Sequence, residues 1–173
     1  MVDLGWTVSF PYSIFQIIIA VQNKYESAIK WLCFSRKRIY MTSEIILINP
    51  WIYDFAAYDL WSKPLGLLYL AAHLRKCGYK IHLVDCLDVH DPHMTLSAST
   101  NPPRRRLFGT GKFWKEKVSK PSPLAPVQRS YSRYGIPKNV FIEALEQIQN
   151  PSAVLVTSLM TYWYPGVKEV IRL

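Results

Sequence analysis

The clearest pattern of hydrophobic and polar positions along the chain is strand-like, then helical, then strand-like again. A continuous apolar run at Glu44–Asn49 is typical of a central parallel strand buried on both faces. Residues 64–77 show the spacing of an amphipathic helix, with Pro64 suited to its first position and Gly78 to the position after its end. A second apolar run at residues 80–84 predicts another strand. This order predicts one βαβ unit of a parallel sheet.

The second half of the chain repeats the alternation of helix and strand. A helical pattern begins after Pro137 and ends at Asn150, an apolar run follows at residues 153–157, and a short third helix is expected at residues 167–173. We therefore predict an α/β fold, a Rossmann-like open parallel sheet that is incomplete, with about three βα units. Such a sheet is small, and we expect one of its edges to be bare.

Residues 1–40 lie outside this pattern. They are either a non-native extension, or a helical or membrane-surface element within residues 14–32. The apolar stretch at residues 10–21 is shorter than the ~20 residues of a membrane span, and it lacks the basic start and the cleavage site of a signal peptide. The predicted units are an N-terminal extension at 1–40 and the α/β domain at 41–173.

Two long loops of the predicted domain have unusual compositions. Residues 51–63 are rich in aromatic and acidic side chains and follow the first strand, at the sheet edge where open α/β folds bind ligands. This loop either packs on itself or also meets a cofactor or another domain. Residues 94–135 form a long basic connection rich in Pro, Ser, Arg and Lys, for which we expect no regular secondary structure.

The net charge of +9 comes from one segment. Residues 101–138 contain ten Lys and Arg residues and one acid, Glu116, whereas positive and negative charges nearly balance in the rest of the chain. Basic residues interleaved with aromatic ones bind RNA or single-stranded DNA, so nucleic acid is one candidate partner. The alternative is a solvated insertion whose aromatic side chains pack on the domain.

Few residues indicate chemistry of their own. The three cysteines are irregularly spaced, which argues against a zinc pattern and favours free thiols in the cytoplasm. The loop after the second strand holds Cys86, Asp88, His90 and His93, which suit either a metal ion or a solvated polar loop; we predict no metal site. Asp85 ends the second strand as a ligand contact or as a cap, but no G-x-G-x-x-G motif supports a dinucleotide.

Several stretches of sequence are unusual enough to indicate a family. They are Asn49-Pro50, Tyr53-Asp54-Phe55-Ala56-Ala57-Tyr58-Asp59, Lys63-Pro64-Leu65-Gly66-Leu67-Leu68-Tyr69-Leu70, Gly78-Tyr79, Asp85-Cys86-Leu87-Asp88, Gly109-x-Gly111-Lys112-Phe113, Arg129-x-Tyr131-Ser132-Arg133-Tyr134-Gly135-Ile136-Pro137 and Thr157-Ser158-x-Met160-Thr161-Tyr162-Trp163-Tyr164-Pro165-Gly166-Val167. With these stretches, residues 44–173 resemble the N-terminal cobalamin-binding-type domain of radical S-adenosylmethionine proteins.

The resemblance implies a Rossmann-like domain that precedes a partial TIM barrel. In the family, the barrel holds an iron–sulfur cluster through C-x-x-x-C-x-x-C, and the cluster binds and cleaves S-adenosylmethionine. Cys33, Cys77 and Cys86 lack this spacing, so the chain is expected to bind neither group and not to be catalytic on its own. Cobalamin is a candidate cofactor, in a base-off form without a protein histidine, because Asp88-x-His90 matches only the start of D-x-H-x-x-G.

The resemblance and the strand order agree on the candidate cofactor-binding residues, and no catalytic residue is nominated. The expected function is that of a cobalamin-binding-type or interdomain module, with a radical S-adenosylmethionine barrel domain or chain as partner. The alternatives are a nucleic-acid-binding protein acting through residues 101–138 and a non-functional gene remnant. The candidates follow the carboxyl ends of the three predicted strands, and they are Asn49, Pro50, Tyr53, Asp54, Pro64, Leu65, Gly66, Asp85, Ser158, Thr161, Tyr162, Pro165 and Gly166.

Overall fold

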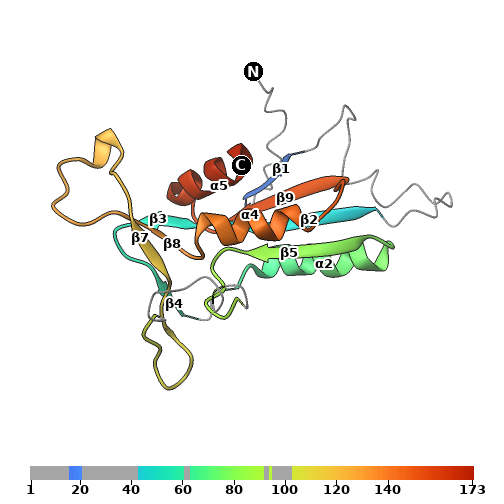
Figure 1. The fold of residues 1–173 in the computed structure, drawn as a ribbon, viewed down its shortest axis with the longest axis horizontal. Helices are drawn as coiled ribbons and strands as arrows, with labels where there is room; N and C mark the ends of the chain where they lie inside the picture. The colour runs from blue at the N-terminus through green and yellow to red at the C-terminus, as the bar shows by residue number, and fades with distance from the viewer. Residues whose placement is uncertain (1–15, 21–42, 61–62, 92–93, 95–102) are drawn as a thin grey trace.

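A four-stranded sheet lies at the centre of the computed structural model, which describes residues 16–20, 43–60, 63–91, 94 and 103–173 (Figure 1). Its strand order is β1-β9-β2-β5. β9, β2 and β5 run parallel to one another, and β1 pairs antiparallel with β9. The bounds are Gln16–Ala20 for β1, Glu44–Asn49 for β2, Lys80–Asp85 for β5 and Ala153–Ser158 for β9. The parallel sheet and its helices confirm the predicted incomplete Rossmann-like α/β fold.

The side chains of β2 alternate between two hydrophobic layers, which explains its continuous apolar sequence. Ile45 and Leu47 pack in a cluster with α2 (Leu65–Lys76) on one face of the sheet. Ile46 and Ile48 pack on the opposite face, in a cluster that contains residues of α4 (Lys138–Glu146) and α5 (Tyr164–Arg172). A strand that is buried on both faces has no polar positions to alternate with its apolar ones.

Two smaller antiparallel sheets extend from the parallel one. The first has the order β3-β8-β7, with bounds Ile52–Asp54, Ser132–Tyr134 and Lys115–Lys117. The second pairs β4 (Tyr58–Asp59) with β6 (Gly111–Lys112). These sheets join the aromatic loop after β2 to the basic connection, which also contains the 3₁₀ turn η1 (Ser122–Leu124).

The expectation that residues 94–135 have no regular structure is therefore wrong for the described part, which holds β6, β7, η1 and β8. Its strands are two or three residues long and pair with distant segments, so they leave no periodic pattern in the sequence. Three of its aromatic side chains, Phe113, Tyr131 and Tyr134, are buried, as the alternative of an insertion packed on the domain predicts, whereas Phe108 is exposed.

Two further expectations change near the ends of the chain. Residues 16–20 form the strand β1, which pairs with the outer edge of β9, where a helix was one of the alternatives. The remainder of residues 1–40 lies outside the described residues. α5 begins at Tyr164, three residues before the predicted start, after the 3₁₀ turn η2 (Thr161–Trp163). Within the described residues, no helix combines the length and apolar character needed to cross a bilayer.

Candidate functional site

The order of the parallel strands identifies one place where a ligand site is expected. β2 lies between β5 and β9, and the two crossovers cover opposite faces of the sheet: α2 connects β2 to β5 on one face, and α4 lies on the connection from β5 to β9 on the other. The carboxyl ends of β2 and β9 are therefore a topological switch point, where open α/β sheets bind their ligands. A cavity lies there, lined by Asn49, Pro50, Trp51, Ile52, Leu87, Ser158, Leu159 and Trp163.

This cavity is small because Trp51 fills the space beside it. The cavity measures about 10 Å³, which is close to the room that one water molecule needs. Trp51 is fully buried, and its Nε1 donates a hydrogen bond to the carbonyl oxygen of Ile136 at 2.7 Å. Its ring lies 4.8 Å from the ring of Phe141, and the guanidinium of Arg133 lies 5.1 Å from the ring centroid. The switch point is a packed core rather than an open cleft.

Two glycines permit this packing. A Cβ added to Gly166 would lie 1.9 Å from the carbonyl oxygen of Trp51. Gly135 has a φ of +125°, and a Cβ there would lie 2.8 Å from the Trp51 ring and still closer to the carbonyl oxygen of Cys86. Side chains at these positions would displace backbone atoms, which cannot move as freely as the end of a side chain. The unusual Tyr-Pro-Gly and Tyr-Gly-Ile-Pro stretches thus have a structural explanation in the burial of Trp51.

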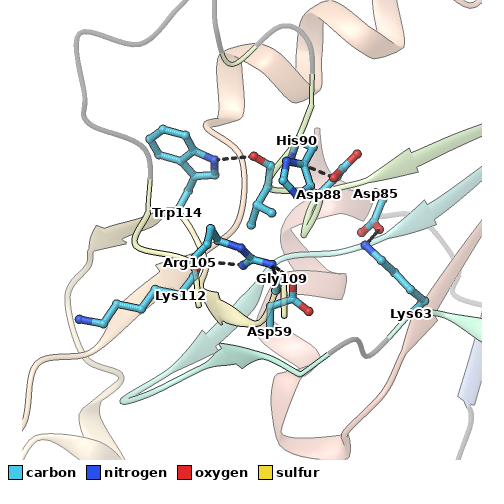
Figure 2. A network of polar contacts seen from close by, with 10 residues as sticks. Asp59, Lys63, Asp85, Asp88, His90, Arg105, Gly109, Lys112 and Trp114 are labelled. Carbon is cyan, nitrogen blue, oxygen red and sulfur yellow. Dashed lines mark hydrogen bonds and ion pairs between the residues drawn. The ribbon is translucent and has the colours of Figure 1, made fainter. Parts of the chain in front are cut away.

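Asn49 and Asp85 form a polar pair where β2 and β5 end. The Nδ2 of Asn49 donates to Oδ1 of Asp85 at 2.6 Å, and the backbone N–H of Leu87 donates to the same oxygen at 3.0 Å. The Nζ of Lys63 lies 3.8 Å from the other oxygen, Oδ2 (Figure 2). Burial raises the pKa of Asp85, and the hydrogen bond from Asn49 opposes that rise. Asp85 therefore caps the strand end, and its second oxygen faces a half-exposed lysine.

Asp54 joins the aromatic loop to the segment after β9. Its Oδ2 accepts a hydrogen bond from Nε1 of Trp163 at 3.1 Å, and its Oδ1 accepts one from the backbone N–H of Phe55 at 2.6 Å. The neighbouring Tyr53 accepts a hydrogen bond from the hydroxyl of Tyr131 at its carbonyl oxygen. Both acceptor oxygens of Asp54 are thus used within the chain.

The remaining candidates divide into an inner and an outer group. Ser158 is buried and donates to the carbonyl oxygen of Met160 at 2.9 Å, while Pro165 lies in the first turn of α5. Pro50 and Pro64 are also buried, and Gly66 is half-buried in the first turn of α2. Only three of the predicted site residues present their side chains to solvent, and they are Leu65, Thr161 and Tyr162.

The described part of the loop after β5 shows no arrangement of metal ligands. The backbone N–H of His90 donates to Oδ1 of Asp88 at 3.0 Å, which closes a turn, and Nε1 of Trp114 approaches the carbonyl oxygen of Val89 at 3.5 Å (Figure 2). Cys86 is buried, and burial raises the pKa of its thiol well above the ordinary value. Among the described residues no group of three or more His, Cys, Asp or Glu side chains could hold a metal ion, and His93 is outside them.

Sequence reasoning missed the residues that decide the shape of this site. In the sequence, Trp51 is one of several aromatic residues of a loop and Arg133 is one of several charges of a basic segment, and no pattern distinguishes either. The signal that could have found them is the glycine at positions 135 and 166, because glycine beside proline and aromatic residues indicates close backbone approach.

Comparisons with protein-family models, with curated proteins and with solved structures found no match for this chain. Its function is therefore inferred from the fold and from the residues at the carboxyl edge of the sheet.

Proposed function

We propose that the chain is an interdomain module of the cobalamin-binding type from a radical S-adenosylmethionine protein, and that it is not catalytic on its own. In this proposal the carboxyl edge of the sheet is the face on which the catalytic barrel docks. The observation that carries it is the filled switch point, where Trp51 leaves a cavity of only about 10 Å³. An edge packed in this way suits contact with a second domain better than enclosure of a ligand.

Cobalamin does not fit inside this edge. A corrin ring needs far more space than one water molecule does, and the polar groups of Asn49, Asp85 and Asp54 are used in hydrogen bonds within the chain. Contact with cobalamin would be limited to the outer surface, at Leu65, Thr161 and Tyr162. In this proposal the barrel alone binds S-adenosylmethionine and the iron–sulfur cluster.

Exposed apolar side chains support the docking role of this edge. Large hydrophobic residues with 42–66% of their surface exposed occur on the two segments that leave the carboxyl ends of β2 and β9. Aromatic and methionine side chains of this kind are enriched in the centres of protein interfaces. We name these residues the docking residues, and they are Tyr58, Leu60, Leu65, Met160, Tyr162 and Tyr164.

Co-purification with a barrel protein tests the proposal. The DNA beside the gene is searched for a reading frame that encodes C-x-x-x-C-x-x-C. The protein it encodes is then co-expressed with the chain, with an affinity tag on one of the two proteins. We expect the two proteins to co-purify and the Tyr162→Ser/Tyr164→Ser variant to lose most of the barrel. The matched control is Tyr69→Ser on the outer face of α2, where the side chain is 77% exposed. Absence of such a reading frame, or equal loss in both variants, would contradict the docking role.

Titration with hydroxocobalamin, followed by visible absorbance, tests the cofactor separately. We expect no tight binding by the chain alone, because the filled edge offers no enclosed space. A stoichiometric spectral change with the isolated chain would show that the edge opens for cobalamin, and it would contradict the interdomain role as proposed.

A further inference from the structure

The loop of residues 103–112 projects from the body of the molecule and exposes two large apolar side chains at its apex. It is the yellow loop at the lower edge of the view, beyond β4 (Figure 1). Leu107 is 92% exposed and Phe108 is 76% exposed, and Leu107 has the highest exposure of the large hydrophobic residues in the described part of the chain. Side chains exposed to this extent present apolar surface to water, and adjoining exposed apolar residues often mark an interaction site.

Backbone hydrogen bonds hold this apex in a tight turn. The N–H of Arg106 donates to the carbonyl oxygen of Thr110 at 2.7 Å, and the N–H of Gly109 donates to the carbonyl oxygen of Arg106 at 3.0 Å. Further down, the N–H of Lys112 donates to the carbonyl oxygen of Arg104 at 3.2 Å. The apex is therefore ordered before it meets a partner, which lowers the entropic cost of binding.

Arg105 anchors the loop to the domain. Its guanidinium forms an ion pair with Asp59 of β4 at 2.6 Å and also donates to the carbonyl oxygens of Gly109 and Lys112 (Figure 2). The side chain is turned back into the loop and is only 22% exposed. Arg105 thus braces the loop and does not contribute a free charge to its surface.

The exposed charges of the loop itself are all positive. Arg104, Arg106 and Lys112 are exposed, and residues 103–112 contain no acidic residue. An apolar tip with a cationic rim matches the surface of a bilayer that contains anionic lipids, where apolar groups enter the acyl boundary and basic groups contact the headgroups. We propose that this loop binds anionic membrane surfaces, with Leu107 and Phe108 inserting and the three cations contacting the lipid phosphates.

Single-stranded nucleic acid is a less suitable ligand for this loop. Its binding sites combine a cationic groove with aromatic platforms on which bases stack. Phe108 is the one aromatic side chain at the apex, whereas Leu107, the more exposed residue, has no π face for stacking, and Arg105 is engaged within the protein. The basic segment also has an open groove of about 420 Å³, lined by residues 117–120 and 128–131. This groove is on the connection between β7 and β8 and not at the apex of the loop.

Co-sedimentation of the full chain with vesicles tests this inference. One set of vesicles is pure phosphatidylcholine, and a second contains about one third phosphatidylglycerol. We expect binding to the second set only, weakened by salt. The Leu107→Ser/Phe108→Ser variant should lower the partition coefficient by about tenfold or more, since each side chain loses its apolar burial. Arg104→Ser/Arg106→Ser should also weaken binding, and the control Tyr69→Ser should leave it unchanged.

Three results would overturn the inference. They are absence of binding to the anionic vesicles, anionic binding that survives Leu107→Ser/Phe108→Ser in full, and binding to a single-stranded polynucleotide that displaces the vesicles and does not need the apex. Because both apex side chains are exposed, the variant is expected to fold, and far-UV circular dichroism with a thermal melt verifies this for every variant. These outcomes do not depend on whether a barrel co-purifies.

Discussion

Replacement of Gly166 by alanine tests whether the filled switch point is as tightly packed as the structure shows. Two effects of opposite sign compete. Alanine in place of glycine within a helix stabilises by roughly 0.5–1 kcal/mol, because glycine loses more backbone entropy on folding. The added Cβ, however, would lie 1.9 Å from the carbonyl oxygen of Trp51, and a backbone atom has to move to accommodate it.

The steric effect is expected to dominate. Overpacking of a buried site costs about 1–3 kcal/mol, and a collision with backbone belongs at the upper end of that range. We therefore expect Gly166→Ala to lower the free energy of unfolding by about 2 kcal/mol, a large share of the roughly 5–15 kcal/mol that a domain possesses. Urea denaturation followed by far-UV circular dichroism measures this as a lower midpoint with an unchanged slope.

The sign of the result decides the interpretation. The control is Lys168→Ala, an exposed position of the same helix, for which a change within about 0.5 kcal/mol is expected. If Gly166→Ala were as stable as the natural chain or more so, helix propensity would have prevailed. The close approach of α5 to Trp51 would then be refuted, and with it the reason that the cavity is small.

Three further changes test the charged groups. Burial raises the pKa of Asp85, so the folded chain binds the proton of this carboxyl more tightly than the unfolded chain does. The free energy of unfolding therefore falls as pH rises from the ordinary pKa to the raised one. Asp85→Asn should remove this fall, which is measured as the urea midpoint at a series of pH values. The hydrogen bond from Lys80 lowers the pKa of Glu44, so stability is lost as pH falls through that lowered pKa, and Glu44→Gln should reduce this acid loss. Glu116→Ala should cost about 1–3 kcal/mol of unfolding free energy, because it leaves the buried guanidinium of Arg133 without its partner at 2.5 Å.

Matched outcomes separate these effects from general damage. Asp85→Asn and Glu44→Gln should change the pH profile in opposite directions, so a shared change in both would argue against the assigned causes. Lys115→Ala, beside Glu116 on the exposed strand β7, should stay within about 0.5 kcal/mol of the natural chain. If Glu116→Ala were equally silent, the Arg133 guanidinium would not depend on the ion pair.

The sequence predicted the parallel sheet because its two inner strands, β2 and β9, are buried on both faces. Ile45 to Ile48 leave no polar position, and the same holds for most of β9, so local sequence alone indicates the environment of these strands. The small sheets could not be predicted in this way. β3 pairs with β8, about eighty residues away along the chain, and three residues are too few to show a period.

The location of the candidate site was also predictable, but its shape was not. Parallel topology places Asn49, Asp85 and Ser158 at one edge, and the structure brings Asn49 and Asp85 into contact. Whether an aromatic loop lines a pocket or fills it depends on distant residues, here Gly135 and Gly166, which let the backbone approach Trp51. Composition and periodicity carry no information about such approaches.

The position of β2 has a consequence for the order of folding. Its pairing with β5 spans a short stretch of chain, whereas its pairing with β9 joins residues more widely separated in sequence. Closing the longer loop costs more entropy, so the βαβ unit of β2, α2 and β5 is expected to form first. During synthesis one edge of β2 therefore stays unpaired until β9 has been made. Pulse-labelling hydrogen exchange during refolding would show this as protection of β5 amides before those of β9. Until β9 arrives, the apolar strand at the centre of the finished sheet is an open edge that other chains can pair with.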